Sequence, residues 1–205
     1  MAKKYLLPLL LCCLLLPACG RSRPQQLYLL NAVNSLALPA PAGVLQTPAL
    51  GIAPLKIAAY LDGQGIATRR AAGNQLKLDD YHQWAGTLQS NVTHVLRENL
   101  SRLLDTDKVY LFPWSQSLPL DFSLNLEIIN LDGEFGGQAR LKAHWSLFAQ
   151  PGKKLLTTRF SDLREEIAGS DYNALVSAQS RLLAGLSREI ATTIRQHQET
   201  TPSQP

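Results

Sequence analysis

Residues 122–147 read FSLNLEIINLDGEFGGQARLKAHWSL, and this stretch decides the fold class. Apolar and polar residues alternate on both sides of a glycine-containing turn at 133–137, which is typical of two antiparallel strands with one buried and one solvated face. The alternation slips by one residue at Ile128–Ile129, which predicts a β-bulge. On the second strand, the side chains predicted to face solvent are those of Arg140, Lys142, His144 and Ser146.

Further strands are expected on both sides of this hairpin, because short apolar runs there are bounded by turn residues. The expected strands are 27–30, which we predict to be buried, and 55–60, 66–72, 75–78, 109–112 and 155–160. Gly73–Asn74 separates two of them and is typical of a hairpin turn. Residues 31–54 are rich in Pro and Ala and are expected to form an extended connection with limited regular structure.

Two segments show the three- and four-residue apolar spacing of amphipathic helices. The first is expected to begin at Asp80, with Gln83 completing a pair that resembles a capping box, and its apolar stripe covers 84–104. The second is expected to begin at Ser170 or Asp171, either of which is a good N-cap residue.

The order of these elements predicts an α+β fold, a two-layer sandwich in which one mixed, mainly antiparallel sheet is covered on one face by two long amphipathic helices. A single domain is expected over residues 27–196, because the sequence shows neither an internal repeat nor a second domain. Residues 197–205 are predicted to be a disordered polar tail.

The N-terminus has the features of an export signal. Residues 1–18 combine Lys3 and Lys4 with an apolar run that is shorter than the roughly 20 residues needed to span a bilayer. The run ends in Leu16-Pro17-Ala18-Cys19, which resembles the lipobox of bacterial lipoproteins. The resemblance implies a diacylglycerol on the thiol of Cys19, cleavage before it and an acyl chain on the new amino group, with no other cofactor.

The alternative is an ordinary secretory signal that is cut after Ala18. The cysteine count favours the lipid, because Cys12 and Cys13 leave with the signal and Cys19 would be the only cysteine of the mature chain. Residues 19–26 then form the lipidated cysteine and a short polar tether. Gly20 stands where an Asp would retain a lipoprotein in the inner membrane, so the sorting rule implies the periplasmic face of the outer membrane.

Composition excludes several classes of protein. The chain has 205 residues, 45% of them hydrophobic and 18% charged, which does not fit a collagen, a long coiled coil or a disordered protein. Without Lys3 and Lys4 it keeps 18 basic residues against 16 acidic ones. A balance so close to neutral argues against a nucleic-acid partner.

The sequence contains no clear catalytic or metal-binding motif. The histidines, His82, His94, His144 and His197, do not stand at metal-ligand spacing. No G-x-S-x-G elbow is present, and Glu165 and Glu166 are adjacent, so on a strand their carboxylates would point to opposite faces. We therefore expect neither a metal site nor catalytic residues, and a protein that is not an enzyme.

Trp114 stands in a predicted loop, between Pro113 and Ser115, and is the one aromatic residue singled out as a candidate for exposure. An exposed loop tryptophan is a candidate interface anchor. A loop folded over the core would bury the same side chain, and both possibilities remain open at this point.

Six short blocks keep a characteristic order along the chain. They are YLL (28–30), KIAAYLD (56–62), WAGTL (84–88), LKAHWSL (141–147), DYNALVSA (171–178) and LSREIA (186–191). Together they resemble the PqiC (YmbA) type of lipoprotein, the auxiliary component of ABC-type intermembrane transport systems, over essentially the whole mature chain. One departure is Gly63, which follows the Tyr-Leu-Asp triplet where members of the family often have a basic residue.

The resemblance implies a periplasmic lipoprotein of the outer membrane that docks an MCE-domain protein and takes part in lipid transport without turnover of its own. Two other classes stay open, a structural adaptor of another envelope-assembly machine and a lipid-anchored hydrolase. A homo-oligomeric ring is a further expectation, because the sheet face with Arg140, Lys142 and His144 and the loop with Trp114 offer two different surfaces for head-to-tail contact.

Overall fold

The computed structural model describes residues 24–38, 47–70, 74–115, 117–149 and 152–200. It confirms the α+β class. The elements, in chain order, are β1 (Gln26–Tyr28), β2 (Leu50–Ile52), β3 (Lys56–Ile57), a 3-10 turn (Ala59–Leu61), β4 (Gly65–Arg69), β5 (Leu76–Trp84), α2 (Leu88–Leu104), β6 (Val109–Leu111), β7 (Phe122–Gly133), β8 (Gln138–Ala149), β9 (Lys154–Glu166) and α3 (Tyr172–Thr200). Among these residues, no helix is long and apolar enough to cross a membrane.

The larger sheet has the order β6-β2-β7-β8-β9, with β3 also paired to β7. Strands β7, β8 and β9 form an antiparallel meander, and the expected bulge lies between Ile128 and Asn130. Strand β2 runs parallel to both β6 and β7. It lies inside the segment that we expected to be an irregular connection, so that expectation is wrong for residues 50–52, which are buried.

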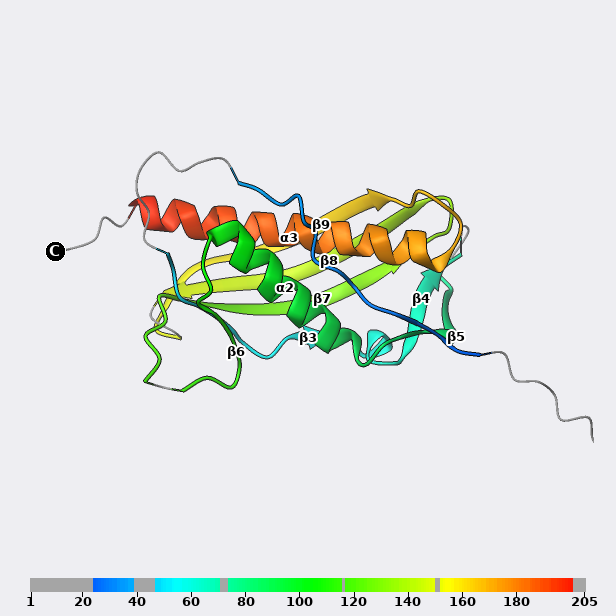
Figure 1. Cartoon of the computed structure of the whole chain (residues 1–205), viewed down its shortest axis with the longest axis horizontal. Helices are drawn as coiled ribbons and strands as arrows, with labels where there is room; N and C mark the ends of the chain where they lie inside the picture. Colours follow the sequence, from blue (N-terminus) through cyan, green and yellow to red (C-terminus); the bar gives the residue numbers. More distant parts are fainter. Residues whose placement is uncertain (1–23, 39–46, 71–73, 116, 150–151, 201–205) are drawn as a thin grey trace, which may run out of the picture.

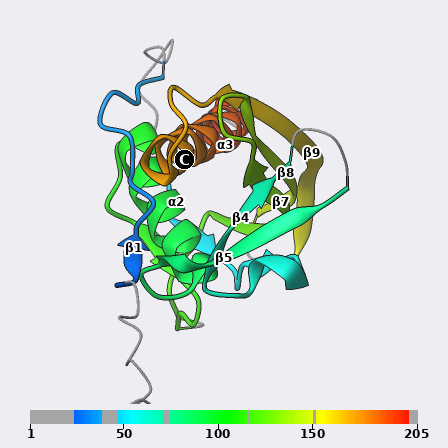
Figure 2. The same ribbon diagram turned by 90° about the vertical axis from the view of Figure 1, so that its right-hand side faces the viewer.

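The strands form two sheets, whereas we expected one. The small sheet has the order β1-β5-β4 and lies across one end of the molecule (Figure 2). Strands β4 and β5 form the hairpin expected around Gly73–Asn74, and β1 runs parallel to β5. The prediction that residues 27–30 form a buried strand is only partly correct, because Leu30 is buried while Leu27 is 62% exposed.

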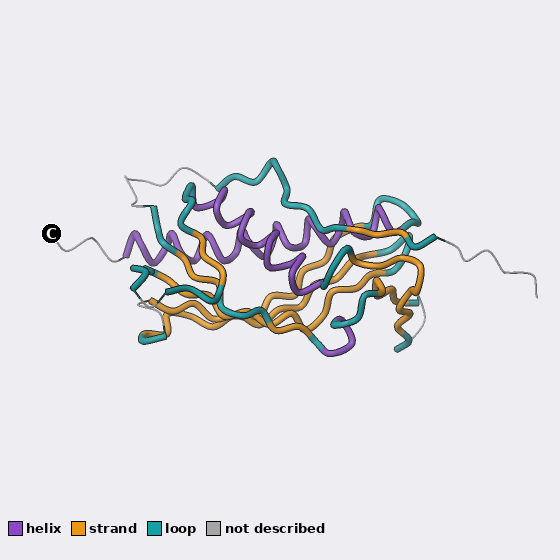
Figure 3. Tube along the Cα trace, turned by 60° about the horizontal axis from the view of Figure 1, so that its bottom comes forward, coloured by secondary structure: helices purple, strands orange, loops and turns teal. Residues whose placement is uncertain are grey.

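Both helices lie on the same side of the larger sheet (Figure 3). Helix α2 begins at Leu88, where the Thr87 side chain accepts a hydrogen bond from the backbone N–H of Ser90. The expected start at Asp80 is wrong, because β5 continues to Trp84. Helix α3 ends at Thr200, so residues 197–200, which we expected to belong to the tail, continue the helix.

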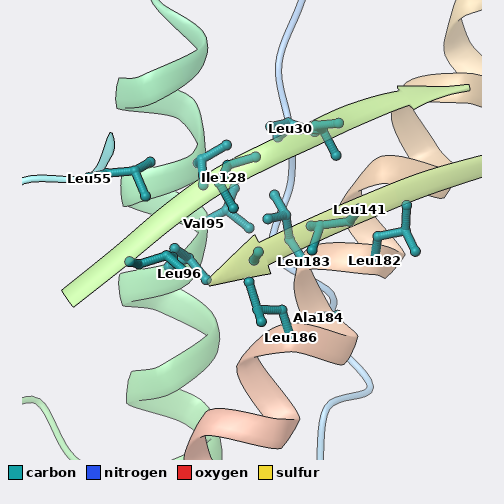
Figure 4. Packing of buried hydrophobic residues seen from close by; sticks show 14 of the residues in the cluster. Leu30, Leu55, Val95, Leu96, Ile128, Leu141, Leu182, Leu183, Ala184 and Leu186 are labelled. Atoms are coloured by element: carbon teal, nitrogen blue, oxygen red, sulfur yellow. The ribbon is translucent and has the colours of Figure 1, made fainter. Parts of the chain in front are cut away.

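The core fills the space between the helices and the inner faces of β7 and β8 (Figure 4). Leu96 from α2, Leu186 from α3 and Leu141 from β8 are completely buried in it. Trp145, predicted as a core residue, is also completely buried, and its indole N–H donates to Ser161 Oγ at 3.0 Å. This packing leaves the opposite face of the larger sheet exposed.

The molecule has two distinct ends along its long axis. The first described residues, β1 and the β4–β5 hairpin lie at one end, and the loop after β6 and the C-terminus of α3 lie at the other (Figure 1). The predicted anchor and the loop of Trp114 are therefore connected to opposite ends of the domain.

Candidate functional site

The predicted lipid attachment residue, Cys19, lies outside the described residues. The description begins at Pro24, two residues before β1. The lipidation of Cys19 therefore remains a prediction from the sequence.

The loop after β6 places two aromatic rings in contact. Trp114 is half-buried and lies against β2 at Gly51, where an added Cβ would come 3.1 Å from the indole and 2.7 Å from Leu120. The ring of Phe112 meets that of Trp114 edge-on, with centroids 5.4 Å apart and an interplanar angle of 85°. Phe112 is 56% exposed.

Trp114 is thus partly folded over the sheet, and the more exposed aromatic is Phe112. Sequence reasoning missed Phe112 because it assigned residues 109–112 to a strand, and β6 ends at Leu111. The absence of a side chain at Gly51 creates the space that seats Trp114. An interface role for Trp114 stays a prediction.

The open face of the larger sheet carries the three basic residues singled out from the sequence. Lys142 pairs with Asp162 at 3.3 Å, and His144 lies between Glu127 on β7 and Phe160 on β9. A shallow hollow on this face is lined by Lys56, Asn125, Glu127, His144 and Ser146, among others. This surface carries charges of both signs, and the exposed ring of Phe160 lies on it beside His144.

A partly buried ion pair connects the two sheets. Arg69 on β4 contacts Asp132 on β7 through two hydrogen bonds, Nη2–Oδ2 at 2.7 Å and Nε–Oδ1 at 3.3 Å. Asn130 donates to both Asp132 and the hydroxyl of Tyr60. The hydrogen bond to Asp132 raises the pKa of Arg69, and burial raises the pKa of Tyr60. This network fixes the small sheet on the larger one.

A second network lies under the small sheet, around Asp79. Its carboxylate accepts from Lys77 Nζ at 2.8 Å and from the backbone N–H groups of Tyr81 and His82, and it contacts His82 Nδ1 at 3.1 Å. Burial alone would raise the pKa of Asp79, but these hydrogen bonds outweigh burial and lower it. The rings of His82 and Tyr172 stack with centroids 3.9 Å apart. Burial and the charge of Asp79 raise the pKa of Tyr172 to about 12.

The remaining candidates for chemistry have structural partners. Ser161 is buried and donates to Glu189 while it accepts from Trp145. Glu165 pairs with Arg181, whereas Glu166 accepts from Gln138. Within the described ranges, His, Cys, Asp and Glu residues form no group of three that could hold a metal.

Comparison with known proteins finds one family model, described as ABC-type transport auxiliary lipoprotein component, which matches residues 28–191. A comparison with curated protein sequences finds no match.

Two solved structures share the fold. One is a crystal structure of an uncharacterized protein, 22% identical, with a TM-score of 0.66 over 84% of this chain and 99% of that one. The other is protein XCC0632 from Xanthomonas campestris, 15% identical, with a TM-score of 0.68 over 85% of this chain and 98% of that one. At these identities the likeness extends to the fold alone.

Proposed function

Because the chain belongs to the family of ABC-type transport auxiliary lipoprotein components, we propose that it is the docking subunit of an MCE-type intermembrane lipid transport system, anchored to the periplasmic face of the outer membrane through Cys19. The protein acts by binding, and the transport work belongs to its partners. The MCE partner is taken from the resemblance of the sequence blocks, and the arrangement of the domain supports it.

The two ends of the molecule suit this role. A chain anchored at Cys19 enters the domain at β1, at the end that carries the small sheet. The loop with Phe112 and Trp114 lies at the opposite end (Figure 1). A partner that reaches across the periplasm from the inner membrane would meet that loop first.

The observation that carries the proposal is the exposed ring of Phe112 held on a fixed base. Trp114 is seated over Gly51, and Phe112 packs edge-on against Trp114. Aromatic anchors dominate binding energy at interfaces, and a ring that is already ordered loses less conformational freedom when the partner docks. Phe112 and Trp114 therefore form the proposed docking pair.

The test is site-specific photo-crosslinking in native envelopes. A photoreactive phenylalanine analogue at position 112 is expected to capture an MCE-domain protein. The same analogue at position 155 is the control, because Leu155 has a similar exposure of 55% but lies on β9, outside the docking pair. Trp114→Ala should weaken the capture at position 112, since it removes the base of the ring.

Capture of other proteins from position 112, with the lipoprotein well recovered and no MCE protein among them, would refute the proposal. It would favour a structural adaptor of another envelope-assembly machine. Capture of a second copy of this chain would instead indicate the head-to-tail ring, with the loop of Trp114 as one of its two surfaces.

A further inference from the structure

The small sheet carries an unusual share of the exposed apolar side chains. Four of the nine large apolar residues that are exposed in the described chain lie on two strands, β1 and β5. They are Leu27, Leu76, Leu78 and Tyr81. Exposed apolar side chains that are gathered in one place mark an interaction surface, whereas scattered ones need no explanation.

An irregularity in β5 brings these side chains to one face. The pairing of β4 with β5 shifts between Gly65–Gln83 and Ala67–Leu78, so extra residues of β5 are accommodated there. Because of this shift, Leu76 and Leu78 on one side of it and Tyr81 on the other all point outward. Leu27 pairs with Gln83, two residues from Tyr81, and joins the same face.

The contacts made by the inward-facing side chains of β5 determine which side chains face outward. Asp79 points inward and holds the backbone N–H groups of Tyr81 and His82. His82 stacks on Tyr172, the first residue of α3. With the inner side chains held in this way, the apolar side chains of the outer face have no place in the core.

The short distance between this face and the predicted anchor indicates that the bilayer covers the face. Residue 26 is the first of β1, and the seven residues from Cys19 to it span at most about 25 Å when fully extended. Strand β1 is an outer strand of the same small sheet. A lipid on Cys19 therefore keeps this face within a short reach of the bilayer.

We propose that the outer face of the small sheet is a membrane-contacting surface, with Leu27, Leu76, Leu78 and Tyr81 lying in the interfacial region of the bilayer to which Cys19 is anchored. The inference rests on the anchoring part of the proposed function. Apolar side chains flanked by basic ones are the composition that binds anionic bilayer surfaces. Arg70 is exposed at the hairpin, and Arg21 and Arg23 precede β1 in the sequence.

Contact with the bilayer orients the whole domain. With the small sheet on the membrane, the long axis directs the loop of Phe112 away from it (Figure 1). The anchor alone sets no direction for the domain, so the membrane contact adds the direction in which the docking pair is presented.

The test uses the mature lipoprotein with its lipid, reconstituted into vesicles of phosphatidylethanolamine and phosphatidylglycerol. Because lipid blocks the thiol of Cys19 and the other cysteines leave with the signal, Leu78→Cys supplies the single thiol for an environment-sensitive fluorophore. Leu155→Cys is the matched control, since its exposure of 55% compares with 46% for Leu78. Tyr81→Cys is a second probe of the same face.

At positions 78 and 81 we expect a blue shift of emission and a loss of intensity when the acyl chains carry bromine quenchers, with neither change at position 155. Vesicle-bound protein is first separated by flotation. If this protein shows the same emission and quenching at all three positions, the membrane contact is refuted while the anchor stands. A blue shift without quenching that grows with protein density would also overturn the membrane contact, because a second copy would then cover the face. Protein that does not float with the vesicles would overturn the anchor as well.

Discussion

Replacing Arg69 by Met should uncouple the small sheet from the larger one. The substitution keeps the length of the side chain but removes both hydrogen bonds to Asp132. Asp132 is completely buried, whereas the Arg69 side chain is 30% exposed. The change therefore leaves a carboxylate inside the protein with Asn130 as its remaining donor.

The size of the effect follows from that asymmetry. Removing one partner of a buried pair costs roughly 3–5 kcal/mol of unfolding free energy. The partial exposure of Arg69 and the remaining donor place Arg69→Met near the lower end, at about 3 kcal/mol. For a domain of this size such a loss lowers the melting temperature by about 6–12 °C.

Urea unfolding of the lipid-free chain, followed by circular dichroism, measures this difference. Asp132→Asn combined with Arg69→Met should recover part of the loss, because no buried charge is then left, and the cycle should give a coupling of about 2 kcal/mol. Arg102→Met is the control, since it removes only exposed contacts, with Glu98 and Asn34, and should cost less than about 0.5 kcal/mol. Equal costs for the two arginine variants would refute the reasoning.

Two further predictions concern the anchor and the network under the small sheet. Cys19→Ala should abolish incorporation of labelled palmitate, because the thiol is the acceptor, and persistent labelling would contradict the lipobox. The pKa of Tyr172 is raised to about 12 from an unfolded value of about 10, so its contribution to stability is complete below pH 10 and is lost as the pH rises toward 12. Unfolding free energies of Tyr172→Phe should therefore fall less steeply than those of the parent between these pH values, and parallel curves would argue against the assignment.

The hairpin of residues 122–147 was predictable because its information is local. Alternation, a glycine turn and a slip of one residue appear directly in the sequence, and the structure has the two strands and the bulge. The start of α2 was not predictable in this way. Asp80 and Gln83 have the spacing of a capping box, but residues 82–84 pair with β1, and this pairing keeps the segment in a strand.

The division into two sheets depends on contacts that no local sequence pattern predicts. Three-residue strands such as β1 and β2 have too few residues to show a period, and their partners are distant in the chain. The same limit applied to the docking pair. The position of Trp114 depends on Gly51, a residue that is notable only for the side chain it lacks.

The parallel pairing of β2 with β6 and β7 bears on the order in which the chain can fold. Leu50 can form its strand pairings only after Val109 and Phe122 have been added to the chain. The strands of the meander from β7 to β9, in contrast, are joined by short turns. Long-range pairings of this kind form slowly, because a long loop must close before they contribute any energy. A chain that emerges N-terminus first therefore presents β1 without its partner until β5 arrives, and β2 without partners until β6 and β7 arrive. We expect the meander to form from local contacts, and β2 to join it only after both of its partner strands are present.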